Sequence, residues 1–453
     1  MTELLSPAGT IRNMEYAFAY GADAVYAGQP RYSLRVRNND FTLDNLAYGI
    51  NRAHELNKKL YVVSNISPHN SKIGTYIRDI QPVIEMQPDA LIMSDPGLIM
   101  MVKDKWPDQE IHLSVQANVV NYATVEFWRR QGVKRIILSR ELSLKEVAEI
   151  REHSPEMEIE VFVHGALCMA YSGRCLLSGY MNHRDANQGS CTNACRWKYD
   201  AHEAEETYSG DYVPKGVQEF NPASFKAEPT LGAGAPSEKV FLLQELNRPN
   251  EYMPTFEDQH GTYIMNSKDL RAIQHVEELI KMGVHSLKIE GRTKSHYYAA
   301  RTTQAYRKAI DDATAGRPFD MSLMDTLENM SNRGYTEGFF RRHVHDEYQN
   351  YERGNSISTK QQFVAEVQQD LGDSLLLDVK NRFEVGDNLE LMTPNGNINF
   401  DLNTLVDKHD KPRQDAPGSG FIVKIPKPEA CFTTDFSKAL LIRNLPNQVI
   451  AHD

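Results

Sequence analysis

Apolar and polar positions follow one repeated pattern over the first 163 residues of the chain. A short apolar run is followed by a polar turn and then by an amphipathic stretch, as at residues 44–58 and 124–131. Runs of this length fit buried strands and stretches of this period fit helices, so the pattern predicts a parallel sheet with helices between its strands. The seven runs are residues 4–5, 24–27, 60–63, 90–93, 111–115, 135–138 and 159–163.

An eighth run, HSLKIEGR at residues 285–292, has the composition of a further strand. Eight strands with intervening helices predict an α/β fold of the (β/α)8 TIM-like barrel type, and an open doubly wound sheet is the alternative. The helix before the eighth strand is expected to be capped by Ser267, with Asp269 in its first turn. Residues 295–316 predict the helix that follows that strand.

Two stretches depart from the barrel pattern. Residues from about 196 to 262 hold clusters of Pro, Gly and Ala and predict an insertion after strand seven. Near residue 355 the pattern changes to short alternating strands, with turns at residues 394–396 and 417–418. We therefore expect a barrel domain over residues 1–350, which carries the insertion, and a small C-terminal β-barrel domain over residues 360–453.

Residues directly after each strand are candidates for the active site, because the active sites of TIM-like barrels lie at the C-terminal ends of the strands. Glu141, His164 and Glu290 could act as acids or bases there. Arg140 and Arg292 could each hold a carboxylate through two parallel hydrogen bonds. A structural ring of salt bridges, and for His164 a hydrogen-bonded loop histidine, are the alternatives. Other strands are followed by small or polar residues, among them Gly9, Gly28, Asn65, Ser94 and Gln116.

Four of the five cysteines follow the seventh strand, with gaps of six, fifteen and three residues between them. Four thiolates can hold a tetrahedral zinc ion or a four-iron, four-sulfur cluster. The gaps are looser than the two-residue knuckles of zinc ribbons, which suits the larger cluster, but zinc and no metal both stay open. The fifth, Cys431, lies far away and is interpreted as a buried structural residue. The four candidate metal ligands are Cys168, Cys175, Cys191 and Cys195.

Composition narrows the classes of function. The 453 residues are 41% hydrophobic and 25% charged, with no apolar run of membrane-spanning length and no signal peptide, so we expect a cytoplasmic protein without a membrane partner. A net charge of -11 argues against a protein that coats nucleic acid indiscriminately, although a local basic cleft for one RNA remains compatible with it. The sequence lacks HExxH, GxSxG and P-loop motifs.

The cysteine stretch resembles the signature of peptidase family U-32, the collagenase-like peptidases. The resemblance rests on EVFVHGALC at residues 160–168 and GRCLLS at residues 173–178, and it extends to the opening ELLSPAGT, the LKIEGR strand and the RGYTEGF loop. It covers nearly the whole chain.

The resemblance implies a function that composition does not. Family members of this type act in hydroxylation without molecular oxygen, and one forms 5-hydroxyuridine at the wobble position of tRNA, the first step toward 5-carboxymethoxyuridine. That pathway depends on prephenate and on the iron–sulfur assembly machinery. Relatives bind a four-iron, four-sulfur cluster through four cysteines, which correspond by motif to the four candidates here. The expected partner is the tRNA anticodon loop, and Arg140 and Arg292 could clamp prephenate. A peptidase, and a non-catalytic RNA-binding factor with a structural zinc, are the alternatives.

Overall fold

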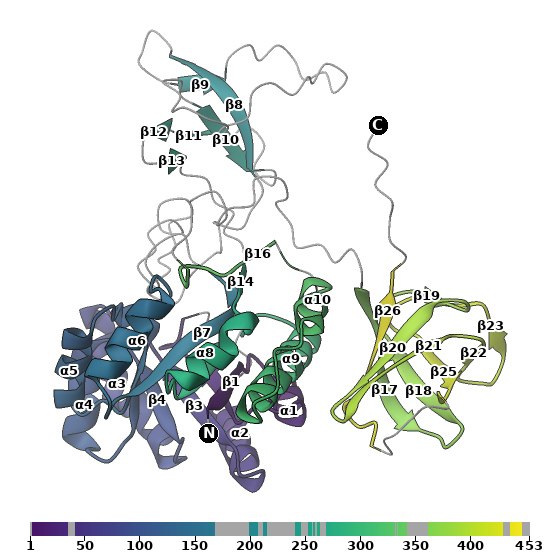
Figure 1. Ribbon diagram of the computed structural model, residues 1–453, viewed down its shortest axis with the longest axis horizontal. Coiled ribbons are helices and arrows are strands. Elements are labelled where there is room, and N and C mark those ends of the chain that lie inside the picture. The colour runs from purple at the N-terminus through teal and green to yellow at the C-terminus, as the bar shows by residue number, and fades with distance from the viewer. Residues whose placement is uncertain are drawn as a thin grey trace.

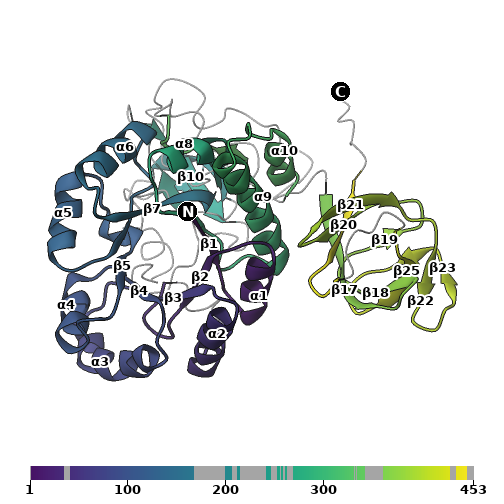
Figure 2. The same ribbon diagram turned by 60° about the horizontal axis from the view of Figure 1, so that its bottom comes forward.

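The computed structural model describes residues 2–34, 41–167, 269–330, 332, 334–341, 361–428 and 435–445, and the backbone of short strands between residues 199 and 262. Its N-terminal part is a closed barrel of eight parallel strands, seen end-on in Figure 2. The TIM-like fold class predicted from the sequence is confirmed. The strands are β1 (Glu3–Pro7), β2 (Ala24–Gly28), β3 (Lys59–Ser64), β4 (Ala90–Met93), β5 (Ile111–Leu113), β6 (Arg135–Ile137), β7 (Glu158–Ala166) and β15 (Ser286–Ile289).

The barrel closes at β15, which pairs in parallel with both β1 and β7. Ser286 stands opposite Glu3 on one side and opposite Glu160 on the other. The pairing with β7 contains a register shift between Lys288 and Ile289, where His164 rather than Val163 faces Ile289. This bulge reverses the in-and-out alternation of β7 beyond Phe162.

Helices form a ring around the barrel (Figures 1 and 2). Their starts are specified locally: Ser143 and Glu146 form a capping box, and Asp95 caps a helix that opens with Pro96. The helices are α1 (Ile11–Ala19), α2 (Leu43–Glu55), α3 (Asn70–Glu85), α4 (Pro96–Lys105), α5 (Tyr122–Arg130), α6 (Leu144–His153), α8 (Val276–Lys281), α9 (His296–Thr314) and α10 (Ser322–Glu328), with 3-10 turns η2 (Val115–Ala117) and η6 (Ile273–His275).

One predicted element is wrong. Asp269 does not lie in the first turn of a helix but begins β14 (Asp269–Arg271), which runs antiparallel to the end of β7 and pairs with β16 (Tyr335–Thr336). β7 is long enough to extend past its barrel neighbours, and its last residues need a partner for their backbone groups. The helix begins later, at Val276, and Ser267 lies outside the described residues.

Between β7 and β14 the chain forms short strands that do not belong to the barrel. Four of them make a sheet in the order β11-β10-β8-β9, and two more pair with each other. The strands are β8 (Tyr199–Glu206), β9 (Tyr212–Pro214), β10 (Phe241–Glu245), β11 (Tyr252–Thr255), β12 (Glu257–Asp258) and β13 (Gly261–Thr262).

The C-terminal part is an antiparallel β domain with its own apolar core. Eight strands pair in the order β21-β20-β26-β17-β18-β25-β22-β23. Residues 342–360 lie outside the described residues, so the boundary between the two domains stays a prediction. The strands are β17 (Gln361–Asp370), β18 (Ser374–Val379), β19 (Phe383–Glu384), β20 (Asn388–Thr393), β21 (Gly396–Asp401), β22 (Leu405–Asp407), β23 (Pro412–Arg413), β24 (Asp415–Ala416), β25 (Ile422–Pro426) and β26 (Leu440–Asn444).

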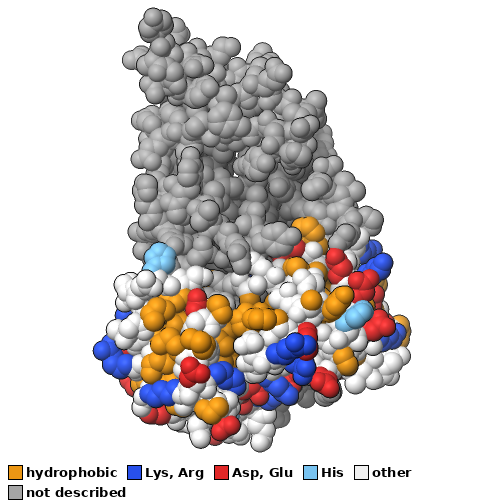
Figure 3. Space-filling model, turned by 90° about the vertical axis from the view of Figure 1, so that its left-hand side faces the viewer, with side chains coloured by type: hydrophobic (Ala, Val, Ile, Leu, Met, Phe, Trp, Pro, Cys, Tyr) orange, Lys and Arg blue, Asp and Glu red, His pale blue; other side chains and the backbone are white. Residues whose placement is uncertain are grey.

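The outer faces of the barrel helices mix apolar and charged side chains. Figure 3 shows orange apolar side chains gathered on the side of the barrel where α4 and α5 lie, and the exposed members of these helices include Met100 and Phe127. None of the helices among the described residues combines the length and the apolar character that a membrane crossing requires.

The C-terminal domain lies beside the barrel, against α1 and α9 (Figure 1). Tyr20 donates hydrogen bonds to the carbonyl oxygens of Met392 and Lys438, at 3.1 and 2.9 Å. Deeper in the interface, the two terminal nitrogens of Arg301 donate to the two carboxylate oxygens of Glu390, at 2.8 and 2.7 Å. Arg301 is 1% exposed and Glu390 is 6% exposed, so this ion pair is withdrawn from water.

Arg301→Met tests the pair. The substitution leaves the Glu390 carboxylate buried without its guanidinium, and we expect the free energy of unfolding to fall by about 3 kcal/mol. Arg317→Met is the control, because Arg317 also pairs with an aspartate but its side chain is 58% exposed. Urea unfolding of the control is expected to stay within about 1 kcal/mol of the unsubstituted protein. Equal effects of the two substitutions would contradict a special role for the buried pair.

Candidate active site at the mouth of the barrel

The structure brings three of the predicted rim residues together around Tyr26. The Tyr26 hydroxyl donates to the carbonyl oxygen of Ile289 at 2.9 Å and lies 3.3 Å from Glu290 Oε2. Arg140 Nη2 lies 3.7 Å from the same carboxylate oxygen. The guanidinium carbon of Arg292 lies 5.7 Å from the centre of the Tyr26 ring. Two guanidiniums and one carboxylate therefore lie around Tyr26 at the mouth, which leaves a local positive charge suited to an anion.

Both guanidiniums are held in place by backbone carbonyl groups. Arg140 Nη1 donates to the carbonyl oxygen of Ala166 at 2.6 Å, and its guanidinium carbon lies 3.9 Å from the centre of the Phe162 ring. Arg292 Nη2 donates to the carbonyl oxygen of Leu34 at 2.9 Å. Arg140 Nε is buried without a hydrogen-bond partner, so this side chain retains a donor.

A network of buried charges lies deeper in the barrel, and we call it the ionic floor: Glu3, Arg135, Glu160 and Lys288. Arg135 Nη1 lies 2.5 Å from Glu3 and 3.3 Å from Glu160, and Lys288 Nζ donates to Glu160 at 2.8 Å. Burial favours neutral Glu3, but the charge of Arg135 and the hydrogen bonds from Arg135, Tyr61 and Ser286 together outweigh it and lower the pKa of Glu3. Burial lowers the pKa of Lys288 although Glu160 opposes the shift. Sequence reasoning missed this network, which the alternation of polar residues inside β1, β6, β7 and β15 could have indicated.

Glycines bring the backbones of the rim close together. A Cβ atom at Gly9 would lie 1.8 Å from the carbonyl oxygen of Arg292. Gly165 has a φ of +108°, and a Cβ atom there would lie 2.6 Å from the carbonyl oxygen of Glu290. The main chain that carries Glu290 and Arg292 is therefore fixed between β1 and β7 by contacts that only glycine allows.

His164 does not face the other rim residues. It is 1% exposed and packs against the rings of Tyr298, Tyr306 and Tyr335, at centroid distances of 5.8, 5.5 and 5.5 Å. Tyr306 belongs to α9, which lies outside the barrel. Burial, with smaller effects of the charges of Arg271 and Lys294, lowers the pKa of His164 to about 3. This surrounding favours a neutral packed histidine over an acid or base that exchanges protons with a substrate.

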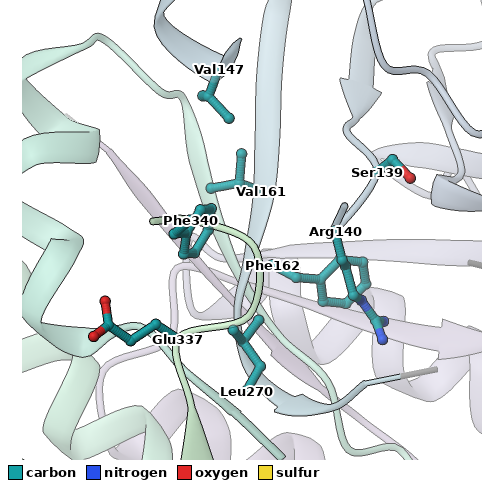
Figure 4. Close-up of a pocket in the computed structure, with 8 residues that line it drawn as sticks. All are labelled: Ser139, Arg140, Val147, Val161, Phe162, Leu270, Glu337 and Phe340. Carbon is teal, nitrogen blue, oxygen red and sulfur yellow. The ribbon is translucent and has the colours of Figure 1, made fainter. Parts of the chain in front are cut away.

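Glu141 is engaged within its own loop, where it accepts a hydrogen bond from the Ser139 hydroxyl. A small pocket lies beside this loop, between β6, β7 and the segment with Glu337 and Phe340. In Figure 4 the guanidinium of Arg140 and the carboxylate of Glu337 point away from one another, with Phe162 and Phe340 between them. Glu337 is occupied by His275, whose Nε2 lies 2.6 Å from it.

An arc of uncharged polar side chains follows β3, β4 and β5 on the opposite side of the mouth. Asn65 Nδ2 donates to Ser114 Oγ at 3.1 Å, and Ser94 Oγ donates to the carbonyl oxygen of Asn65 at 3.1 Å. Gln116 in η2 is 8% exposed, and neither its amide nitrogen nor its amide oxygen has a hydrogen-bond partner. Each buried unpaired polar group destabilises a fold by about 1–3 kcal/mol. The sequence places Gln116 on the rim but gives no sign that its amide is unpaired.

The four candidate metal ligands Cys168, Cys175, Cys191 and Cys195 lie outside the described residues, as does Cys431. Cys168 is the residue after Leu167, which follows the last residue of β7. Within the part of the chain that the structure describes, no group of three or more His, Cys, Asp or Glu side chains could hold a metal ion. The metal-binding role of the four cysteines stays a prediction.

Comparison with known proteins decides the family. The family model described as Peptidase family U32 matches residues 9–350, and the model of the U32 C-terminal domain matches residues 359–443. The chain belongs to peptidase family U32.

Two relatives of this U32 protein resemble it over nearly their whole length, and a third matches over part of its length. It is 64% identical to "tRNA hydroxylation protein P" of Escherichia coli (strain K12), over 98% of this chain and 97% of the relative. It is 61% identical to the protein of the same name from Haemophilus influenzae, over 98% and 96% of the two chains. It is 29% identical to "23S rRNA 5-hydroxycytidine C2501 synthase" of Escherichia coli (strain K12), over 74% of this chain and 45% of that one.

The environment of His164 gives a prediction for this U32 protein. Its pKa of about 3 in the folded state lies below the ordinary value of 6.5, so the unfolded chain takes up the proton first as the pH falls. The stabilisation by neutral His164 is complete above pH 6.5 and is lost as the pH falls from 6.5 toward 3. We expect the unsubstituted protein to lose about 2 kcal/mol more than His164→Gln between pH 7.5 and 5.0 in urea unfolding. Parallel losses in both proteins would contradict the neutral, buried state.

Proposed function

We propose that this U32 protein hydroxylates tRNA without molecular oxygen and forms 5-hydroxyuridine at the wobble position, the first step toward 5-carboxymethoxyuridine. The observation that carries the proposal is the similarity over 98% of the chain to two proteins named tRNA hydroxylation protein P. The relative named as a 5-hydroxycytidine synthase supports the same class of reaction, the hydroxylation of a pyrimidine in RNA. Cytoplasmic tRNA is the corresponding substrate pool.

The anticodon loop suits such an enzyme because its bases are unpaired and can be splayed into a pocket. The mouth of this barrel has a charged side, with Arg140, Glu290 and Arg292, and an uncharged side, with Asn65, Ser94 and Gln116. The two sides can hold different parts of a reacting pair.

Hydroxylation of uracil replaces the hydrogen on C5 by a hydroxyl group and removes two electrons from the base. A hydroxyl donor R–OH balances the reaction if it becomes R–H, since it then accepts that hydrogen and those electrons. Prephenate carries a hydroxyl group and two carboxylates and is the proposed donor. Arg140 and Arg292 lie at one mouth, so they would bind and orient it.

The proposed cofactor is a four-iron, four-sulfur cluster on Cys168, Cys175, Cys191 and Cys195. Four thiolates form a donor set that fits such a cluster, and zinc is the alternative. A bound cluster would supply one-electron transfer, and the cell's iron–sulfur assembly machinery would have to deliver it. The position of Cys168 in the sequence, two residues after the end of β7, supports a cofactor on the same face of the barrel as the charged side of the mouth.

A peptidase mechanism receives no support from the described residues. The three buried histidines there are His112, His164 and His275. They face Glu110, the tyrosine cluster and Glu337 rather than a serine or cysteine nucleophile.

The cluster and the reaction are tested with one variant. We expect protein purified without oxygen to contain about four irons per chain and to absorb broadly in the visible range, and Cys191→Ala to lose both. In a strain that lacks the native gene, mass spectrometry of tRNA should find 5-hydroxyuridine after complementation with the unsubstituted gene and not with Cys191→Ala. Cys431→Ala is the matched control and should keep iron and product. Zinc in place of iron in active protein would contradict the redox cofactor.

The prephenate clamp is tested by calorimetric titration of prephenate into the purified protein. Arg140→Lys and Arg292→Lys keep the positive charge but lose the planar fork, so the dissociation constant should rise about 10-fold in each. Arg341→Lys is the control, because that side chain is 56% exposed and pairs with Glu337. Unchanged affinity in both mouth variants would exclude the clamp.

A further inference from the structure

The uncharged arc of the mouth is a preorganised platform. β3 and β5 are not neighbours in the barrel, because β4 lies between them. The hydrogen bond from Asn65, after β3, to Ser114, after β5, therefore links the loops on either side of β4. Ser94 ties the intervening strand to the same group through the carbonyl oxygen of Asn65. These three residues satisfy one another and fix the backbone from which η2 begins.

Gln116 stands apart from this satisfied group. It lies in the turn directly after Ser114, which follows β5, and it is 8% exposed, so it is buried near the mouth of the barrel. In the described residues it is the one side-chain amide whose nitrogen and oxygen are both buried without a partner. A buried and unpaired amide beside a satisfied network has the properties of a recognition group, because a ligand can supply both missing hydrogen bonds.

We propose that Gln116 binds the Watson–Crick edge of the uracil that is hydroxylated, and this inference rests on the proposed function. The amide nitrogen donates to a uracil carbonyl oxygen, and the amide oxygen accepts from N3–H, in two parallel hydrogen bonds. Both atoms of the Gln116 amide, which lack hydrogen-bond partners in the free protein, are then paired at once. Gln116 is thus a specificity-determining residue for the base.

The place of Gln116 also orients the reaction. In the uracil ring C5 lies opposite C2, so an amide that holds N3–H and the C2 carbonyl oxygen leaves C5 facing away from it. β5 lies across the barrel from β1 and β15 (Figure 2). The carbon that is hydroxylated then faces Glu290 and Arg292, which follow β15, and the anionic hydroxyl donor proposed to bind there.

Substitution of Gln116 separates recognition from stability. Gln116→Glu has no amide donor and places its carboxylate against a uracil carbonyl oxygen, whereas it can accept from the amino group of cytosine. Gln116→Met keeps the length but makes no hydrogen bonds, and it removes the unpaired amide from the free protein, so its melting temperature should rise. Gln131→Glu is the matched control, at an exposed position after α5.

The full-length protein, purified without oxygen, is titrated with two anticodon stem–loop RNAs that carry uridine or cytidine at the wobble position. The unsubstituted protein and Gln131→Glu should bind the uridine RNA about 10-fold more tightly than the cytidine RNA. Gln116→Met and Gln116→Glu should lose this preference through weaker binding of the uridine RNA, and Gln116→Met should do so with a normal melting temperature or a higher one.

Each other outcome overturns a defined statement. If the unsubstituted protein forms 5-hydroxyuridine in cells but binds both RNAs equally, or if both Gln116 variants keep the preference, the base contact is wrong and the proposed function stands. A lower melting temperature for Gln116→Met would show that the amide has a structural partner, and it would also overturn the inference. If complementation with the unsubstituted gene restores no 5-hydroxyuridine and neither RNA binds, the proposed function fails together with the inference.

Discussion

The barrel depends on the two ion pairs that Arg135 makes, one with Glu3 and one with Glu160. These residues come from β1, β7 and β6, and Lys288 adds β15 through its bond to Glu160. A carboxylate in this position tolerates withdrawal from water only while its cationic partners are present. The registers of the four strands at the closing seam are therefore coupled, since a slip of one residue would turn a charge out of the network and leave another unpaired. The rim residues Arg140, Glu290 and Arg292 follow strands that the ionic floor aligns.

Most of the fold could be predicted because the local spacing of apolar and polar residues differs between strands and helices. All seven apolar runs and the eighth run at residues 285–292 correspond to barrel strands, and the helix expected at residues 295–316 is α9. β14 was missed because its partner is the overhanging end of β7, about a hundred residues away, and no local pattern records such a pairing. The residues around Asp269 resemble the start of a helix in sequence, but they pair with the free end of β7 and form a strand instead.

The candidate site was predictable to the extent that it follows strand ends. Arg140, Glu290 and Arg292 converge because the carboxyl ends of parallel strands meet at one face. His164 had the same kind of position in the sequence but not in space, because the bulge opposite Ile289 turns it toward the tyrosines of the outer layer. The unpaired state of Gln116 could not be predicted, because pairing among distant side chains, such as that of Asn65 with Ser114, has no signature in a single sequence.

The position of the C-terminal domain has a consequence for how the chain can be divided. Two family models recognise residues 9–350 and 359–443 separately, as if they were independent modules. Physically, Tyr16, Tyr20 and Ala300 of the barrel share an apolar cluster with Met392 and Leu440 of the C-terminal domain. A barrel expressed alone would expose this cluster to water and would become prone to self-association. Evolutionary modularity and mechanical modularity therefore differ in this chain, because the two separately recognised parts share one buried apolar cluster.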